Sequence, residues 1–461
     1  MADVSEETHE PRTESHDPQA PEAWRAFMRT GWGDRELDLP RHPVADLAAR
    51  RRSRLAAAFP GERLVFPAGT YKVRSNDSDY RFRPDTAHTY FSGNQTSDAV
   101  LVVESDATGA AESVLYARPR SSRETDEFFR DRQYGELWAG RRPSVHELSS
   151  SLGIEVRHID ELPDLAAAEK TRDVTRDDEL ARVSSELRLV KDPWEIEQLQ
   201  EACDITTLGF QDSVAEWDRV LEFGERWIEG TFFRRARAMG NDIGYDSIVG
   251  GGKHATTLHW IENSGPITPG ELVLLDMGVE ARSLYTADVT RTLPVDGRFT
   301  ALQRELYDMV YAAQEAGIQA VRPGAPFLAA HDAAMDVLAH GLEDMGLLPV
   351  SAEEALDPDS KVYARWTLHG TSHMLGLDVH DCAQAADDSY RNGTLEEGFV
   401  LTVEPGLYFQ EDDLLVPEVL RGIGIRIEDD ILVTADGHRN LSGSLPRTSA
   451  DVEEWMGSHR G

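Results

Sequence analysis

The sequence contains little cysteine and no long hydrophobic run. Its 461 residues include only two cysteines, Cys203 and Cys382, too few for a disulfide framework and too isolated for a cysteine-based zinc site. No stretch approaches the roughly 18 uninterrupted apolar residues that would indicate a membrane-spanning helix. Residues 1–23 lack both a cationic start and an apolar run, so they do not resemble a signal peptide. These absences lead us to expect a protein of the reducing cytoplasm.

Basic residues are scarce relative to acidic ones. The chain has 47 Lys and Arg against 83 Asp and Glu, so its net charge is -36 at pH 7 with neutral histidine. Because such a charge repels phosphate groups and anionic lipid, we expect neither nucleic acid nor a membrane as a partner. A hydrophobic fraction of 40%, with nine Trp, fifteen Phe and twelve Tyr, is still enough to build a folded core.

Several familiar site motifs are missing as well. Gly250–Lys253 resembles part of a phosphate-binding loop, but His254 stands where Ser or Thr would hold magnesium, so we interpret this segment as a plain turn. Gly422–Gly424 lacks the third glycine of a dinucleotide fingerprint. Neither a His-Glu-x-x-His motif nor a nucleophile elbow occurs. The chemistry must therefore come from residues that are dispersed along the chain.

The pattern of hydrophobic and turn residues divides the chain into three parts. Residues 1–23 are acidic and contain proline, which predicts a solvated tail. In residues 24–180, β-rich runs alternate with helical stretches and predict an α/β domain; these runs are Arg63–Phe66, Thr89–Phe91 and Ala99–Val103. Asp192 as helix N-cap with Pro193 after it begins a new pattern, so residues 181–461 form a second, α+β domain. Its helices are expected at about 193–215, 218–239, 301–322 and 326–345.

A pair of aspartates stands out in the second domain. Asp276 ends the apolar run Leu272–Leu275, and a β-hairpin that returns through Leu284–Thr290 would place Asp288 beside it. A lone Asp at a strand end is usually a cap or turn residue. Two adjacent carboxylates, however, repel each other unless a cation or a proton lies between them.

Two further acids share this setting. Glu404 ends the apolar run Phe399–Val403, where an isolated charge is costly. The run Gly422–Ile431 alternates strictly, so Arg426 and Glu428 point to the same side of the predicted strand. The acids at the ends of these strands are therefore candidates for one shared site.

Histidines supply the nitrogen atoms of the candidate site. They occur as His259, as the two histidines of the glycine-flanked segment His369–His373, and as His380. Each alone is more often structural than a ligand. Four acids on core strands together with one imidazole form a mainly oxygen ligand set, which suits a pair of manganese-like ions better than a thiolate-rich zinc site.

The order of the motifs is specific. They are Leu275–Gly278, Ala287–Thr292, His369–Asp381, Glu404–Gly406 and Arg426–Asp429, supported by Glu229–Phe232 and Gly244–Val249 and, nearer the amino terminus, by Arg74–Tyr80 and Tyr90–Gly93. Together they resemble the pita-bread metallopeptidases, specifically the Xaa-Pro aminopeptidases (aminopeptidase P). The resemblance covers roughly residues 38 to 445. It implies an α+β pita-bread catalytic domain that follows a smaller α/β domain of the creatinase/prolidase type.

The resemblance also assigns roles to residues. The implied metal ligands are Asp276, Asp288, His373, Glu404 and Glu428; the implied substrate and proton-handling histidines are His259, His369 and His380, with Arg426 supporting the ligands. The separation between Asp276 and Asp288 is twelve residues, one more than in well-known relatives, and the extra residue fits in the hairpin loop. Trp138 lies in a segment similar to one that reaches the active site of a neighbouring subunit, which implies a homo-oligomer, a dimer or tetramer. The alternative is a tryptophan in the core of its own domain.

The implied activity is removal of the amino-terminal residue from peptides with proline in second position. Two divalent ions, Mn²⁺ by the ligand chemistry, would hold a bridging hydroxide, and Glu404 would receive the proton of the water. The alternatives are a prolidase that acts on Xaa-Pro dipeptides, a metal-free binding module of the same fold, and a creatinase-like hydrolase without metal.

Overall fold

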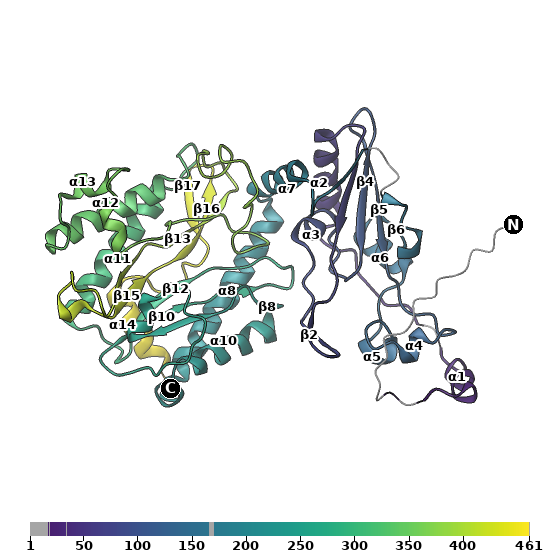
Figure 1. Ribbon diagram of the computed structural model, residues 1–461, viewed down its shortest axis with the longest axis horizontal. Coiled ribbons are helices and arrows are strands. Elements are labelled where there is room, and N and C mark those ends of the chain that lie inside the picture. Colours follow the sequence, from purple (N-terminus) through teal and green to yellow (C-terminus); the bar gives the residue numbers. More distant parts are fainter. Residues whose placement is uncertain (1–16, 18, 34, 166–169, 461) are drawn as a thin grey trace. The chain divides into compact units, whose positions relative to one another are not determined.

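The computed structural model describes residues 17, 19–33, 35–165 and 170–460 (Figure 1). Most of the predicted tail, residues 1–16 and 18, lies outside these ranges. The chain separates into two compact units, Met1–Ser184 and Ser185–Gly461, with the division inside helix α7 (Asp178–Leu189). No helix within the described residues combines the length and apolar character needed to cross a membrane.

The first unit is built on a five-stranded sheet with the order β6-β5-β4-β1-β7. Strand β1 pairs antiparallel with β4 and parallel with β7, and β5 pairs antiparallel with β4 and parallel with β6. The strands are β1 (Arg63–Pro67), β4 (Val100–Ser105), β5 (Ala111–Ala117), β6 (Glu155–His158) and β7 (Thr171–Asp173), and a separate hairpin joins β2 (Val73–Ser75) to β3 (Ser78–Asp79). The sheet is therefore mixed, and the helices between its strands make this an α/β unit.

Helices flank this sheet, and one of them replaces a predicted strand. They are α1 (Glu22–Met28), α2 (Ala45–Ala58), α3 (Thr86–Ser92), α4 (Glu127–Arg130), α5 (Glu136–Ala139), α6 (Val145–Leu152) and the 3₁₀ helix η1 (Ile159–Glu161). The strand predicted for Thr89–Phe91 is wrong. The side chain of Asp85 accepts a hydrogen bond from the His88 amide, and Gly93 in the left-handed conformation ends the helix. These caps outweigh the β propensity of the aromatic residues between them.

The second unit contains the longer helices. They are α8 (Pro193–Ala215), α9 (Trp217–Phe223), α10 (Glu225–Met239), α11 (Ala301–Ala320), α12 (Ala329–Asp344), α13 (Ala352–Leu356) and α14 (Ser449–His459), with 3₁₀ helices η3 (Gly252–Thr256), η4 (Val362–Arg365) and η5 (Glu418–Leu420). Helix α8 begins as predicted, with the Asp192 side chain accepting from the amides of Trp194 and Glu195. The single helix predicted at 218–239 is broken between α9 and α10, because Gly224 adopts a φ of 75°.

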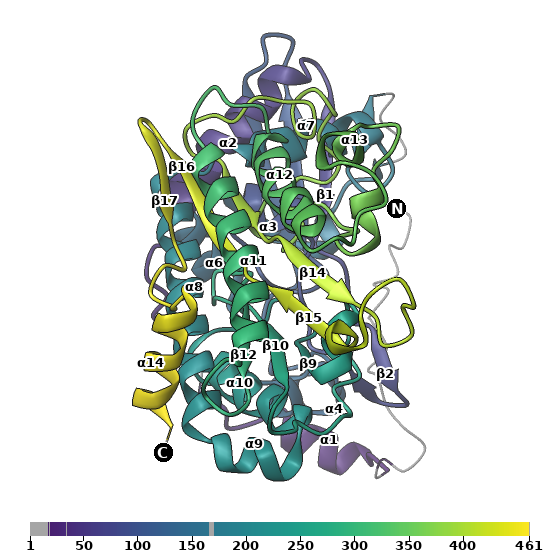
Figure 2. The ribbon, with the colours of Figure 1, turned by 90° about the vertical axis from the view of Figure 1, so that its left-hand side faces the viewer.

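Short antiparallel sheets cross the second unit, and α11 and α12 lie side by side next to them (Figure 2). The strands are β8 (Asp242–Ile243), β9 (Ile248–Gly251), β10 (Leu272–Asp276), β11 (Val279–Glu280), β12 (Thr290–Pro294), β13 (Val400–Val403), β14 (Gly406–Phe409), β15 (Ile423–Arg426), β16 (Asp429–Thr434) and β17 (Gly437–Asn440). The predicted strand 422–431 is divided into β15 and β16, which pair with different partners, β14 and β13. Glu428 stands at this division.

The main core of this unit lies between its helices and strands. It joins Phe210 and Phe232 from α8 and α10, Leu306 and Tyr307 from α11, and apolar residues of β10, β14 and β15. The polar residues that end β10 and β15, Asp276 and Arg426, point away from this core into a cavity.

Candidate active site

A cavity of about 490 Å³ opens among the strand ends of the second unit. Its lining residues are Tyr245, Asp246, Ile248, Leu258, His259, Ile261, Asp276, Asp288, His369, Gly370, Ser372, His373, Val379, His380, Glu404, Arg426 and Glu428. All of the candidate site residues except Trp138 are therefore brought together in one place.

The antiparallel pairing of β10 and β12 positions the two aspartates, which confirms the predicted hairpin. Asp276 lies opposite Thr290, the first residue of β12, so Asp288 comes just before that strand. The hydroxyl of Tyr245 lies 2.7 Å from Oδ1 of Asp276 and 2.6 Å from Oδ1 of Asp288. Both carboxylates are buried, at 7% and 5% exposure.

Arg426 and Glu428 flank these aspartates from the end of β15. The guanidinium of Arg426 forms an ion pair with Asp276 and donates to the hydroxyls of Thr290, at 3.1 Å, and Tyr408, at 2.9 Å. Thr290 in turn donates its hydroxyl proton to Oε2 of Glu428 at 2.6 Å. Arg426 and Glu428 therefore both face the cavity, as the alternation predicted, although β15 ends at Arg426.

His373 and Glu404 are held by the segment 371–373 and the end of β13. The amide of His373 donates to the hydroxyl of Thr402 at 3.1 Å, and the amide of Glu404 donates to the carbonyl of Thr371 at 2.8 Å. Nε2 of His373 then lies 3.3 Å from Oδ2 of Asp288 and 3.6 Å from Oε1 of Glu404. The imidazole thus faces two carboxylates.

The donor set fits divalent metal. Asp288, His373 and Glu428 each offer one ligand atom, and the three atoms lie within 4.8 Å of one another. Burial, followed by the charges of its acidic neighbours, raises the pKa of Glu428 well above its ordinary value, and burial raises the pKa of Glu404 to about 7. Buried acids that repel each other in this way are stabilised in their charged form by cations.

The remaining histidines line the cavity around this cluster. Nε2 of His369 lies 2.8 Å from the hydroxyl of Tyr408. Burial and the charge of Arg426 lower the pKa of His369 to about 4, so its ring is neutral near pH 7. The ring of His380 packs edge-on against that of His373, with centroids 4.3 Å apart. His259 is exposed, in the segment that follows η3.

Trp138 lies in the first unit, on α5. Its indole nitrogen donates to the carbonyl of Phe129 at 2.8 Å, and the guanidinium of Arg132 lies 4.7 Å from its ring centre. The side chain is 49% exposed. The alternative of a core tryptophan is therefore wrong.

Two tyrosines of the site were given no role from the sequence. Tyr245 touches both aspartates, and Tyr408 touches His369 and Arg426. Tyr245 belongs to the motif Gly244–Val249, and Tyr408 follows Glu404 by four residues. The available signal was the position of each tyrosine in or beside a motif of the site, since a buried hydroxyl needs a polar partner.

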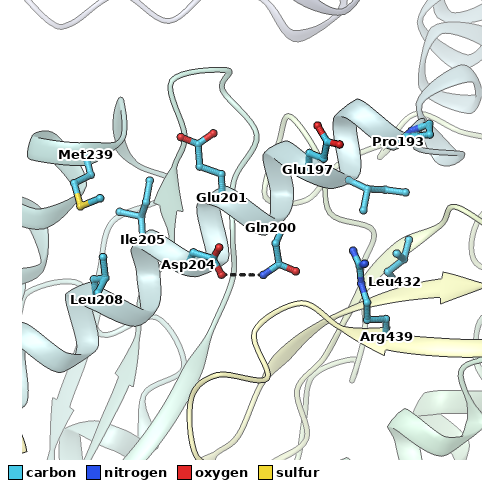
Figure 3. Close-up of a pocket in the computed structure, with 11 residues that line it drawn as sticks. Pro193, Glu197, Gln200, Glu201, Asp204, Ile205, Leu208, Met239, Leu432 and Arg439 are labelled. Atoms are coloured by element: carbon cyan, nitrogen blue, oxygen red, sulfur yellow. Dashed lines mark hydrogen bonds between the residues drawn. The ribbon is translucent and has the colours of Figure 1, made fainter.

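A second cavity, of about 690 Å³, lies along α8 and differs in its chemistry (Figure 3). Glu197, Glu201 and Asp204 line it from exposed positions of the helix, and Gln200 donates to Asp204 at 2.9 Å. No imidazole is among the described residues that line it. The three carboxylates are in contact with water. They therefore differ from the buried, crowded acids of the first cavity.

Comparison with known proteins agrees with this geometry. The family model of metallopeptidase family M24 matches residues 197–435, and the model of the aminopeptidase P N-terminal domain matches residues 48–175. The chain is 52% identical to Xaa-Pro aminopeptidase 1 of Streptomyces coelicolor, with 100% of this chain and 98% of that protein covered. It is 35% identical to the Xaa-Pro aminopeptidase of Escherichia coli, with 88% and 96% covered.

A solved structure extends the likeness to three dimensions. Aminopeptidase P from E. coli with the inhibitor Pro-Leu matches with a TM-score of 0.79 at 31% identity, covering 91% of this chain and 99% of that one. Fold and site together define a metallopeptidase. The chain belongs to metallopeptidase family M24, and the predicted resemblance to the Xaa-Pro aminopeptidases, with their amino-terminal domain and pita-bread catalytic domain, is confirmed.

Proposed function

We propose that this enzyme removes the amino-terminal residue from peptides whose second residue is proline. The observation that carries the proposal is the convergence of five ligand-type side chains and three histidines on one cavity of about 490 Å³. The high identity to Xaa-Pro aminopeptidases over the whole chain supports it. Proline-containing peptides are thus the partners that we propose, and neither nucleic acid nor a membrane is among them.

Asp276, Asp288, His373, Glu404 and Glu428 would hold two divalent ions. Their mainly oxygen ligand set favours Mn²⁺ over a metal that prefers sulfur. Bound there, the two ions would lower the pKa of a water between them to give a bridging hydroxide, polarise the scissile carbonyl and offset the charge that develops on its oxygen.

The residues of the chain handle the protons. Glu404, which lines the cavity at the end of β13, is placed to take a proton from the attacking water and to give it up again. The nitrogen of a peptide bond to proline carries no hydrogen and must be protonated before it leaves. Glu404 or the neighbouring His369 would deliver that proton. Nδ1 of His369 lies 3.6 Å from Oε2 of Glu404.

The histidines and Arg426 complete the proposed machinery. His369, whose ring lies between the Gly370 carbonyl and the Tyr408 hydroxyl, lines the cavity and would contact the substrate there. His380 and His259 line the same cavity and would contact the peptide. Arg426 supports Asp276 and Tyr408 from behind.

The alternative within enzymes is a prolidase, which shares the metal ligands but acts on dipeptides. The match of residues 48–175 to the aminopeptidase P N-terminal domain favours the aminopeptidase. Comparing hydrolysis of Xaa-Pro, Xaa-Pro-Yaa and Xaa-Ala-Yaa decides between them. We expect cleavage of the proline tripeptide and little of the others; equal cleavage of the alanine peptide would contradict the specificity, and a strong preference for the dipeptide would indicate a prolidase.

The organisation of the enzyme follows from the same proposal. We take residues 24–180 as the amino-terminal domain, after the tail 1–23, and residues 181–461 as the catalytic domain. The half-exposed Trp138 is free of its own core, which supports a role at the site of a neighbouring subunit in a homo-oligomer, a dimer or tetramer. The two cysteines are buried and unpaired, which suits the cytoplasm.

Trp138 gives a direct test of that assembly. Trp138→Ala should raise KM for longer peptides and leave the melting temperature nearly unchanged, because a half-exposed side chain contributes little packing. Unchanged kinetics, or a fully active monomer in light scattering, would remove Trp138 from the site.

A further inference from the structure

The segment 252–265 forms one wall of the catalytic cavity. It contributes Leu258, His259 and Ile261 to the lining. The side chain of His259 forms no hydrogen bond with any residue that the structure describes. The position of its ring therefore depends on how the backbone of this segment is held.

A single buried carboxylate holds both ends of the segment. Glu225, the first residue of α10, has a relative exposure of 0%. Its Oε1 accepts from the amide of Gly251 at 2.8 Å, and its Oε2 accepts from the amide of Gly265 at 2.6 Å. Its own amide donates to the carbonyl of Gly265 at 3.1 Å. Glu225 thus joins the residue before the segment to its last residue.

Two side chains of the segment turn toward the same carboxylate. The indole nitrogen of Trp260, next to His259 in sequence, donates to Oε2 of Glu225 at 2.9 Å. Nδ1 of His254 lies 2.8 Å from Oε1, and its ring stacks on that of Trp260 with centroids 4.0 Å apart. The carboxylate therefore has four nitrogen partners, which uses its whole capacity to accept hydrogen bonds.

The glycines at both ends permit this close approach. A Cβ atom on Gly265 would lie 2.5 Å from the His254 ring and 2.9 Å from Oε1 of Glu225, and one on Gly251 would lie 2.8 Å from the carbonyl oxygen of Pro266. The plain turn predicted for Gly250–Lys253 is accordingly wrong, since Gly250 and Gly251 end β9 and η3 follows directly. The glycines serve the packing of the backbone around Glu225.

We propose that Glu225 is a positioning residue for the reaction, a buried anchor that fixes the segment 252–265 and thereby places His259 against the peptide. This inference rests on the proposed function, because that function assigns His259 to the substrate. Glu225 itself does not line the cavity. It acts through Trp260 and the backbone on both sides of His259.

Glu225→Gln is the primary test. The glutamine amide keeps the shape of the side chain but offers only one carbonyl oxygen, so its NH₂ group faces N–H donors. Asn263, which accepts from the Val249 amide and donates to the Ser247 carbonyl, still ties the segment down, so the variant should fold. Glu222→Gln, a change at an exposed position of α9, serves as the matched control.

A double-mutant cycle with His259→Ala separates positioning from a general loss of stability. Glu225→Gln should lower kcat/KM for Xaa-Pro-Yaa about tenfold or more. In the His259→Ala background, the same change should cost less than about twofold, because the residue it positions is already absent. Glu222→Gln should leave kcat/KM unchanged. An equal loss in both backgrounds would overturn the proposal.

Hydrogen exchange provides a readout that needs no activity. Glu225→Gln should speed amide exchange in residues 251–265, with β10 and β12 unchanged, and Trp260→Phe, which removes one donor and keeps the stacked ring, should give a smaller effect of the same kind. Unchanged exchange in this segment would also overturn the proposal. Because exchange is measured on any folded protein, a wild type that cleaves no proline peptide would refute the activity without obscuring this result.

Discussion

Two groups of buried carboxylates in the catalytic unit are treated in opposite ways. Asp381 and Asp413 each face cationic partners: Asp381 lies 3.0 Å from Nε of Arg188, and Asp413 accepts from Arg365 at 2.9 and 2.8 Å. The hydrogen bonds from Arg365 lower the pKa of Asp413 to about 2. Although burial alone would raise it, Arg188 and Lys191 hold the pKa of Asp381 below its ordinary value.

The acids of the cavity outnumber their cationic partners. Asp276, Asp288, Glu404 and Glu428 share two cationic groups among the described residues that line the cavity, Arg426 and the imidazole of His373, and no lysine is among them. Although burial opposes it, the hydrogen bond with Asp288 and the charge of Glu404 raise the pKa of His373 to about 9. Burial raises the pKa of Asp276 and Glu404, and that of Glu428 most clearly. Burial alone therefore does not mark a functional site. A shortage of cationic partners does, and divalent metal would remove it.

The largest effect is expected from removing a cavity carboxylate. Asp288→Ala should lose bound metal and lower activity by roughly 10³-fold, because Asp288 contributes to the three-residue ligand cluster. Metal analysis and Xaa-Pro-Yaa hydrolysis measure both. Glu201→Ala, which removes a carboxylate from the cavity along α8, is the control and should change neither. If Asp288→Ala keeps its metal and activity, the cavity carboxylates do not form the metal site.

Removing a paired carboxylate should instead cost stability. Asp381→Asn removes the carboxylate charge that faces both the buried guanidinium of Arg188 and the buried ammonium of Lys191, and we expect the free energy of unfolding to fall by roughly 3–5 kcal/mol. Denaturant unfolding measures it. A loss under about 1 kcal/mol would contradict this prediction, because it would show that the charge of Asp381 contributes no more than that of an exposed ion pair.

A change beside the cluster should separate substrate contact from metal binding. His380→Ala should lower kcat by about 10²-fold and leave the metal content unchanged, since His380 packs against His373 and is proposed to contact the peptide. Metal analysis of the purified variant is the check. If the metal is lost, His380 belongs among the ligands.

The pH dependence of stability should differ in sign between the two groups. In the metal-free protein, Glu404 holds a proton up to a pKa of about 7 against an ordinary 4.5, so its contribution makes the protein less stable as pH rises from 4.5 to 7. Asp413, with a pKa of about 2 against 3.8, stabilises above pH 3.8, and that contribution is lost as pH falls toward 2. Denaturant unfolding across pH measures both slopes, and Glu404→Gln should flatten only the first. If the slope between pH 4.5 and 7 remains in Glu404→Gln, groups other than Glu404 cause it.

Much of this comparison was within reach of the sequence. Apolar runs that end in Asp276 and Glu404 predict acids at strand ends, and the alternation of Arg426 and Glu428 predicts a shared direction. The sequence also identified the start of α8, because capping is local. Most of its failures come from contacts between residues that are distant in sequence.

Three errors illustrate this. The break at Gly224 depends on the backbone of Gly265, since a Cβ at Gly224 would lie 2.3 Å from that carbonyl oxygen. The segment Thr89–Phe91 is helical because its caps and burial favour a helix over its β propensity. The strand through Glu428 is divided because its two halves pair with strands of different sheets. None of these partners is adjacent in the sequence, apart from the caps of α3.

We propose that the crowded acids of the cavity bind catalytic metal. Titrating the chelator-treated protein with Mn²⁺, while bound metal and Xaa-Pro-Yaa hydrolysis are followed together, tests it most directly. We expect activity to be absent without metal and to rise with about two ions bound per chain, as a two-metal hydrolytic site requires. Full activity in the metal-free protein would contradict the account.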